Sequence, residues 1–377
     1  MNLGIDAIST NSGGAIEHLK NLLQNFDKQK KFVKCFVFTQ KKTLRFLPKK
    51  KNIIYITSAL AINLFTRVFW QTFVLNSQLK FYNIDILFVT GGSFITNFKP
   101  IVSISQNLLP FDNKQTDKYK YSLFFFKLKI LKKVLINSFN NANGVIFLTN
   151  FSKNKIIPKL YFFTKKKIAI IPHSVIQKKK YIVKNYKKFE FFYVSNIDSY
   201  KNQDFLIKAF DNFFKKHTDY QNKIKVSFYG SSYKPALDKF NKLLKKSKFS
   251  KSYNYHGLIT KKKIYRSSKN YERIFLFSSS CENFSVSLLE GMAHGFPILC
   301  CNLNPMKDVL GKSALFYKNN SIEDFEKKLL IIIKNFDLRK KISKYSFKLS
   351  KKYGTNKIAK QTYKFIYEVY LKNKNEK

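Results

Sequence analysis

Segments typical of strands alternate with segments typical of helices along nearly the whole chain, in two successive series. In the first series, apolar runs such as 2–9 and 31–39 are separated by stretches with helical periodicity, for example 63–79. A polar, basic stretch without a clear period, 177–189, interrupts the pattern before the second series begins at 190. Alternation of this kind predicts parallel sheets covered by helices, and two series predict two domains.

The chain is long enough for this arrangement, since 377 residues with 45% hydrophobic content can form two cores. We expect an N-terminal Rossmann-like domain over 1–176, a linker over 177–189 and a second Rossmann-like domain over 190–350. The residues 351–377 are expected to form a C-terminal helical tail that packs back on the first domain.

The strongest local signal is the stretch 278–302. It follows an apolar run, 273–279, and ends in another, 297–301, both of which predict buried strands. The residues between them predict a helix over 285–294, with Gly295 as its stop signal. In open α/β sheets, ligands bind outside the carboxyl ends of the strands, so this turn and helix are expected to border a ligand site.

Two acids occupy this stretch, Glu282 in the turn and Glu290 about two helical turns further on. A carboxylate offers two acceptor oxygens and can bind two sugar hydroxyls at once. The spacing, together with ENFS, LLEGMAHG and FPIL in this order, resembles the E-x7-E motif of retaining glycosyltransferases of family 4. The alternative is an ordinary strand–helix–strand unit whose acids form a solvated face.

This resemblance implies the GT-B fold, which has two Rossmann-like domains facing across a cleft, here followed by the helical tail. It implies a hexosyltransferase that moves a sugar from a nucleotide-sugar donor on the second domain to a glycan or lipid-linked glycan acceptor on the first. Such enzymes act in cell-surface polysaccharide or lipopolysaccharide synthesis. Glu282 would be the catalytic carboxylate, and Glu290 would bind the ribose.

The segment 193–210 resembles the donor-binding segment of the same family. Lys201 falls on the lysine that binds the diphosphate, just before a helix N-terminus that also favours an anion. Where relatives have Gly-Arg, this chain has Ser195 and Asn196, so the second cation is missing from its expected place. In a chain so rich in lysine, an arbitrary lysine is usually a solvated surface group.

Further donor contacts are implied by the turn before the helix. Asn283, Phe284 and Ser285 stand where relatives often have Gly-Phe-Gly, so that the turn backbone would bind the donor sugar or phosphate. Leu289, which precedes Glu290, is expected to face the nucleotide as well.

In the first domain, Gly13 and Gly14 lie between the first strand and the first helix, where backbone can approach a phosphate. By themselves the two glycines indicate only a turn. The resemblance implies in addition that this loop faces the donor pyrophosphate and the acceptor. Gln106 and Asn107 are expected on the acceptor side. Gln106 stands where many relatives have histidine, and glutamine cannot act as a general base.

No metal or other cofactor is expected. The sequence contains no D-x-D, and its four cysteines form no C-x-x-C pair, which favours buried free thiols in a reducing cytoplasm. The net charge of +49 arises almost wholly from lysines spread along the chain, so nucleic acid is not an expected partner. The charge leaves open a peripheral contact of the protein with anionic lipid at the inner face of the cytoplasmic membrane.

The stretch 124–136 is a candidate for this membrane contact, because it is both basic and apolar. Phe124, Leu128, Leu131 and Leu135 form one helical stripe, which fits either a helix packed on the first sheet or a membrane-surface helix.

Two rival functions remain open at this point. One is a catalytically inactive protein of this fold that binds a glycan or a nucleotide, favoured by the departures at Asn196, Gln106 and Ser285. The other is a sugar-nucleotide epimerase on the same two-domain frame.

Overall fold

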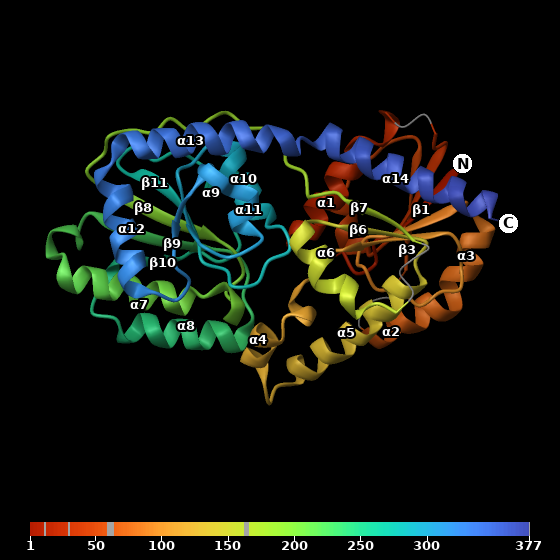
Figure 1. Cartoon of the computed structure of the whole chain (residues 1–377), viewed down its shortest axis with the longest axis horizontal. Helices are drawn as coiled ribbons and strands as arrows, with labels where there is room; N and C mark the ends of the chain where they lie inside the picture. Colours follow the sequence, from red (N-terminus) through yellow and green to blue (C-terminus); the bar gives the residue numbers. More distant parts are fainter. Residues whose placement is uncertain (11–12, 29–30, 59–63, 162–165, 377) are drawn as a thin grey trace. The chain divides into compact units, whose positions relative to one another are not determined.

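The computed structural model describes residues 1–376 except 11–12, 29–30, 59–63 and 162–165. The chain forms two compact units, each built around one parallel sheet (Figure 1). The first unit consists of Met1–Ser174 together with Tyr353–Lys377, and the second of Val175–Lys352. The predicted α/β class with two Rossmann-like units is confirmed.

The first sheet has seven strands in the order β3-β2-β1-β4-β5-β6-β7. Its strands are short and mostly apolar on both sides, as expected for parallel strands covered on both faces. They are β1 Asn2–Asp6, β2 Lys34–Thr39, β3 Ile53–Thr57, β4 Ile86–Val89, β5 Ile101–Ser105, β6 Gly144–Phe147 and β7 Lys167–Ile170.

The helices of the first unit cover both faces of this sheet. The connections β3 to β4 and β5 to β6 run in one direction along the strand order, and β1 to β2 runs in the other. Because such crossovers are right-handed, the helices of the first two connections lie on one face and α1 lies on the opposite face. The helices are α1 Gly13–Gln24, α2 Leu64–Phe69, the π-helix Trp70–Val74, α3 Leu75–Phe81, α4 Asn113–Thr116, α5 Leu123–Asn141, α6 Asn150–Ile156 and α14 Thr355–Asn375.

The C-terminal helix α14 completes the first unit. The hydroxyl of Tyr363 donates to the carbonyl of Leu22 in α1 at 3.0 Å, and Tyr363 is buried. Val369 lies so close to β6 that a side chain at Gly144 would approach it to 2.6 Å. The last helix is therefore part of the core of the first unit.

The second sheet has six strands in the order β10-β9-β8-β11-β12-β13. The strands are β8 Phe189–Val194, β9 Ile224–Tyr229, β10 Tyr253–Tyr255, β11 Glu272–Phe277, β12 Ile298–Cys301 and β13 Leu315–Tyr317. The helices of this unit are α7 Gln203–Lys216, α8 Lys234–Lys246, α9 Lys261–Ile264, α10 Val286–His294, α11 Met306–Leu310, α12 Ile322–Lys334 and α13 Phe336–Ser350.

The unit β11–α10–β12 has the strand, turn, helix and strand that the sequence predicts. Ser285 caps α10, since its hydroxyl accepts from the backbone N–H of Leu288 at 3.3 Å. Gly295 ends the helix with a left-handed φ of 72°, a conformation that glycine adopts without a steric penalty. A side chain at Gly291 would come within 2.7 Å of the Phe275 ring, so the missing side chain lets α10 pack directly on β11.

A buried arginine ties the second sheet to the segment before β11. The Nε of Arg273 donates to Glu190 at 2.7 Å, and its Nη1 donates to the carbonyls of Ile264 and Arg266 at 2.7 and 2.6 Å. The guanidinium also lies 4.1 Å from the centre of the Phe192 ring. A guanidinium can satisfy these partners together because its donors are held in a rigid plane.

Candidate functional site

The candidate site lies at the carboxyl edge of the second sheet. β8 and β11 are neighbouring parallel strands, so the loops that follow them leave the sheet at the same edge. The loop after β8 carries Lys201, and the loop after β11 carries Glu282. Parallel pairing therefore brings together two residues that are 81 positions apart in the sequence.

Lys201 and Glu282 form an ion pair, and each side chain is only 12% exposed. Burial by itself lowers the pKa of Lys201, but the Glu282 carboxylate and the hydroxyls of Tyr200 and Tyr193 outweigh burial and raise it. Lys201 therefore stays protonated at any physiological pH. The ammonium also lies 4.7 Å from the centre of the Tyr200 ring, which favours a cation.

The loop that carries Lys201 is fixed against the loop that follows β11. The Ser278 hydroxyl donates to the carbonyl of Lys201 at 2.7 Å, and the Asn202 side chain donates to the carbonyl of Ser278 at 3.1 Å. Asn202 has a left-handed φ of 56°, which asparagine tolerates better than most residues. α7 begins at the next residue, so Lys201 stands two positions before the first residue of this helix.

Glu290 is held by two residues that the sequence analysis did not single out. One carboxylate oxygen pairs with the Lys261 ammonium, and the other accepts from the Tyr265 hydroxyl at 2.9 Å. Lys261 begins α9, and Tyr265 follows it by four residues, so both lie on one side of this short helix. The run of three lysines at 261–263 hid this signal, because a lysine run indicates a solvated surface.

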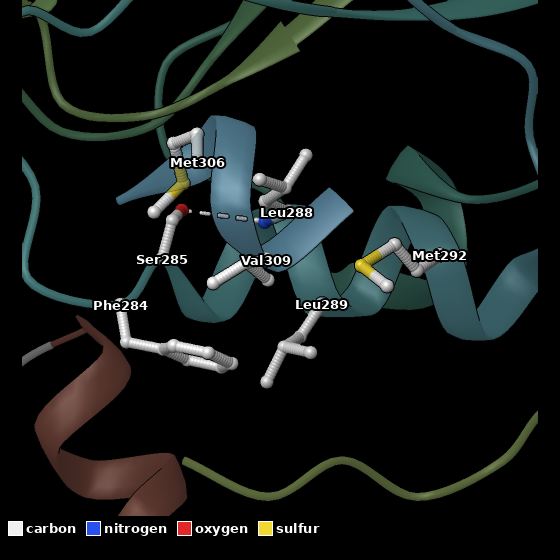
Figure 2. A pocket seen from close by; sticks show the side chains of 7 residues that line it. All are labelled: Phe284, Ser285, Leu288, Leu289, Met292, Met306 and Val309. Carbon is white, nitrogen blue, oxygen red and sulfur yellow. Dashed lines mark hydrogen bonds between the residues drawn. The ribbon is translucent and has the colours of Figure 1, made fainter. Parts of the chain in front are cut away.

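The residues of the turn and of α10 line a small apolar pocket (Figure 2). α11 borders it with Met306 and Val309. Phe284 and Leu289 are buried there, at 6% and 1% exposed. Leu289 therefore contributes packing under the turn, and Glu290, the next residue, carries the polar group.

Two asparagines, Asn196 and Asn283, were also predicted to bind the donor. The Asn196 side chain accepts from the Ser231 hydroxyl at 2.8 Å, and its carbonyl accepts from Gln203 at 2.8 Å. Asn283 is 4% exposed and follows Glu282 in the turn. No positive charge stands at position 196, so the departure noted in the sequence remains.

The other predicted residues belong to the first unit. Gly13 begins α1 with a left-handed φ of 58°, and a side chain there would meet no atom within 4 Å; Gly14 follows it. Gln106 and Asn107 follow β5, and the Asn107 side chain accepts from the backbone N–H of Leu109 at 3.1 Å. β1 and β5 are separated by β4 alone, so both loops leave the same edge of the first sheet.

Within the described parts of the chain, no group of three His, Cys, Asp or Glu side chains is arranged to hold a metal ion. The carboxylates at the candidate site are instead paired with lysines.

Comparison with known proteins places this geometry in a class. Residues 174–349, a little under half of the chain, match the family described as Glycosyl transferases group 1. This match contains Lys201, Glu282 and Glu290. Solved structures with the same two-sheet architecture define the fold as GT-B.

One relative is an uncharacterized glycosyltransferase of Haemophilus influenzae, 25% identical over 317 residues that cover 83% of this chain and 84% of the relative. The sucrose-phosphate synthase of Thermosynechococcus elongatus is similar in structure, with a TM-score of 0.77, 12% identity and coverage of 98% and 99%. A mutant of TarM from S. aureus has a TM-score of 0.62 and 20% identity over 77% of this chain. This chain spans 57% of the TarM chain. Fold, family match and relative together support a glycosyltransferase of the GT-B fold.

Proposed function

We propose that this protein is a retaining hexosyltransferase of family 4 that uses a nucleotide-sugar donor. The observation that carries the proposal is the buried Lys201–Glu282 ion pair in the loops before α7 and α10, with Glu290 on α10 itself. A buried cation in the loop that leads into a helix N-terminus suits a diphosphate, because that end of a helix carries partial positive charge. A carboxylate in the same place suits the sugar that the diphosphate carries.

Lys201 and Glu290 can bind the donor because each keeps hydrogen-bonding capacity beyond its present partners. The Lys201 ammonium has three protons, so it can keep Glu282 and still donate to a phosphate oxygen. The Glu290 carboxylate offers about four acceptor positions, of which Lys261 and Tyr265 take two. Two ribose hydroxyls can therefore bind Glu290 while its present partners stay in place.

The proposed reaction needs no protein base. The acceptor hydroxyl oxygen forms a bond to the anomeric carbon as the bond from that carbon to the diphosphate oxygen breaks. The electron pair of the broken bond stays on the diphosphate, and the same phosphate group takes the proton of the acceptor hydroxyl. Glu282 stabilises the positive charge that develops on the sugar, and Lys201 stabilises the negative charge on the leaving group.

We propose that the acceptor is a glycan or a lipid-linked glycan of cell-surface polysaccharide or lipopolysaccharide synthesis, bound by the first unit. Gln106 and Asn107 are the candidate acceptor contacts, and Gly13 and Gly14, whose loop leaves the same edge of the first sheet, are candidate donor contacts. The structure of the TarM mutant was solved with UDP and α-GlcNAc-glycerol, which makes UDP-sugars the first donors to test. The reaction is proposed to need no metal.

We also propose a cytoplasmic location. The four cysteines are buried and form no disulfide: Cys35, Cys281, Cys300 and Cys301. Free thiols are typical of proteins that work in a reducing compartment.

Two substitutions test the proposal by separating the roles of the acids. Glu290→Gln should weaken binding of UDP and of the full donor alike, by about 10-fold or more, because a charge-assisted hydrogen bond is worth about 1.5–3 kcal/mol. Glu282→Gln should lower kcat by about 100-fold with little change in UDP affinity, because its charge acts mainly in the transition state. Calorimetry with UDP and steady-state kinetics measure both effects.

Glu326→Gln is the matched control. Its side chain is 13% exposed and pairs with Lys216, so its environment resembles that of Glu282. Lys216 ends α7, whose 14 residues span about 21 Å, so the control lies far from Lys201. Nucleotide binding without turnover by the wild type would favour the inactive protein. Loss of UDP binding in Glu282→Gln alone would reverse the two roles.

A further inference from the structure

The first unit exposes large apolar side chains along two helical segments. In α5, Leu123, Phe126 and Ile130 are 90%, 60% and 58% exposed. In the segment from α2 to α3, Phe73 and Phe81 are 68% and 78% exposed. Soluble proteins rarely leave so many large apolar groups together on one surface unless the surface binds something.

Both segments lie on the same face of the first sheet. The crossovers β3 to β4 and β5 to β6 run in one direction along the strand order, which places α2, α3 and α5 in one layer. The segment 94–96 joins them, since Thr96 is hydrogen-bonded to Asn76 in α3 and the backbone N–H of Phe94 donates to Ser138 in α5 at 2.9 Å. Figure 1 shows α2 and α5 in this layer of the first unit.

α5 has a second apolar face besides the one that packs on the sheet. Leu128 and Leu135, from the stripe predicted in the sequence, are buried, and Phe124 and Leu131 are partly buried. That stripe is thus the packing face. Leu123, Phe126 and Ile130 stand outside it, so the packing of this unit does not account for their apolar character.

The charge of this layer has one sign. Neither 64–81 nor 123–141 contains Asp or Glu. The basic residues of the two segments are Arg67, Lys80, Lys127, Lys129, Lys132 and Lys133. Exposed aromatic and aliphatic groups interspersed with lysines match an anionic bilayer surface, where lysines meet lipid phosphates and the apolar groups enter the acyl boundary.

Tyr121 extends the same surface at the N-terminal end of α5. It is 99% exposed and has a left-handed φ of 64°, which is rare for an aromatic residue. Tyrosine is favoured at the level of lipid headgroups, because its ring is apolar and its hydroxyl is polar.

We infer that the outer side of α2, α3 and α5 is a docking surface for an anionic lipid bilayer. A second copy of the chain fits less well, because a symmetric interface would set these lysines against each other with no acid between them. Nucleic acid would match the charge but leave the exposed Leu123, Phe126 and Ile130 without apolar partners. No described helix is long and apolar enough to cross a membrane, so the contact is made at the bilayer surface.

Co-sedimentation of the full chain with vesicles tests this inference without any donor or acceptor, and so independently of the proposed reaction. The vesicles are phosphatidylcholine with or without phosphatidylglycerol, at low and high salt. The apolar variant carries Leu123→Gln, Phe126→Gln and Ile130→Gln, which keep the charge and the helix-forming character of α5. We expect it to reduce the partition onto anionic vesicles at least about 10-fold.

Two charge variants provide a matched pair, since each loses three exposed lysines. α8 is the control helix, because it is basic but carries no exposed large apolar residue among those described. The substitutions to Gln are at Lys127, Lys129 and Lys133 in α5, or at Lys242, Lys245 and Lys246 in α8. We expect the α5 variant to reduce binding several-fold more than the α8 variant.

Three results would overturn the inference. Equal losses of vesicle binding in the α5 and α8 variants would show that the overall positive charge of the protein, and not this surface, attracts it to the vesicles. Unchanged vesicle binding in the apolar variant, with loss of a dimer by light scattering, would identify a second copy as the occupant. Equal binding of the wild type to vesicles with and without phosphatidylglycerol would exclude an anionic surface. Circular dichroism confirms that each variant is folded.

Discussion

The two units share one architecture but use their aromatic residues differently. Among the described residues, five phenylalanines are exposed, namely Phe46, Phe69, Phe73, Phe81 and Phe126, and all belong to the first unit. In the second unit every phenylalanine is buried or half-buried. The same fold class can thus direct aromatic side chains into the core or onto a surface.

The two units also differ in the polar side chains that they bury. The second unit buries Arg273, which pairs with Glu190, and Arg339, whose Nη1 donates to two backbone carbonyls. The first unit buries His18 edge-on against His173 at 4.8 Å, and neither nitrogen of His18 has a hydrogen-bond partner. The buried arginines thus belong to the second unit, whereas the first unit buries the neutral histidine pair and the Asp6 carboxyl group.

The largest expected effect tests the buried arginine. Arg273→Met leaves Glu190, 15% exposed, without its cation and frees two carbonyls, which should cost about 3–5 kcal/mol. Hydrogen exchange resolved by peptide should show loss of protection in the second unit only. Lys262→Met, an exposed site, serves as the control. Equal loss of protection in both units would contradict this prediction.

The glycines at close contacts test the two cores with a smaller effect. Gly144→Ala would bring a methyl group within 2.6 Å of Val369, and Gly291→Ala would bring one within 2.7 Å of Phe275. Overpacking of this kind costs about 1–3 kcal/mol. Exchange should rise in α14 for the first variant and in α10 for the second. Gly13→Ala would meet no neighbour but has a left-handed φ, so its smaller cost would come from the backbone alone.

Acidification distinguishes the units through the histidine pair. Burial lowers the pKa of His18 from 6.5 to about 4, and burial followed by the neighbouring His18 lowers the pKa of His173 as well. The unfolded chain therefore binds these protons first as the pH falls, and stability present above pH 6.5 is lost between pH 6.5 and 4. His18 alone should cost about 1.4 kcal/mol at pH 5.5.

The measurement is the unfolding free energy of the first unit as a function of pH. His18→Leu should flatten the loss below pH 6.5. In the second unit two shifts oppose each other, because burial raises the pKa of Glu272 to about 7 and lowers that of His294 to about 4, so acidification relieves one group and strains the other. An unchanged slope in His18→Leu would assign the acid sensitivity to other groups.

The smallest expected effect is that of chelation. Donor binding and turnover should be unchanged by EDTA, because the cations at the candidate site are Lys201 and Lys261. Calorimetry and kinetics with and without EDTA measure this. Loss of activity restored by Mg²⁺ or Mn²⁺ would show that the diphosphate is held by a metal.

Local signals in the sequence are sufficient to predict the fold class and some residues of the candidate site. The pattern around Ser285 and Gly295 predicts α10 correctly, because its cap and its stop are set by neighbouring residues. Lys201 and Glu282 were each named, but their ion pair depends on the pairing of β8 with β11, which periodicity does not reveal. Lys261 could not be separated from 65 other lysines by sequence, because only tertiary contact with Glu290 distinguishes it.

The placement of α14 has a consequence for synthesis on the ribosome. The second unit is continuous in the chain, whereas the first receives Tyr363 and Val369 only after the whole second unit has been made. Domains generally fold as units during synthesis, so the unit begun first should be finished last. Until α14 arrives, the surface around Leu22 and Gly144 stays uncovered, and a nascent chain stalled before residue 353 should depend on chaperones to stay out of aggregates.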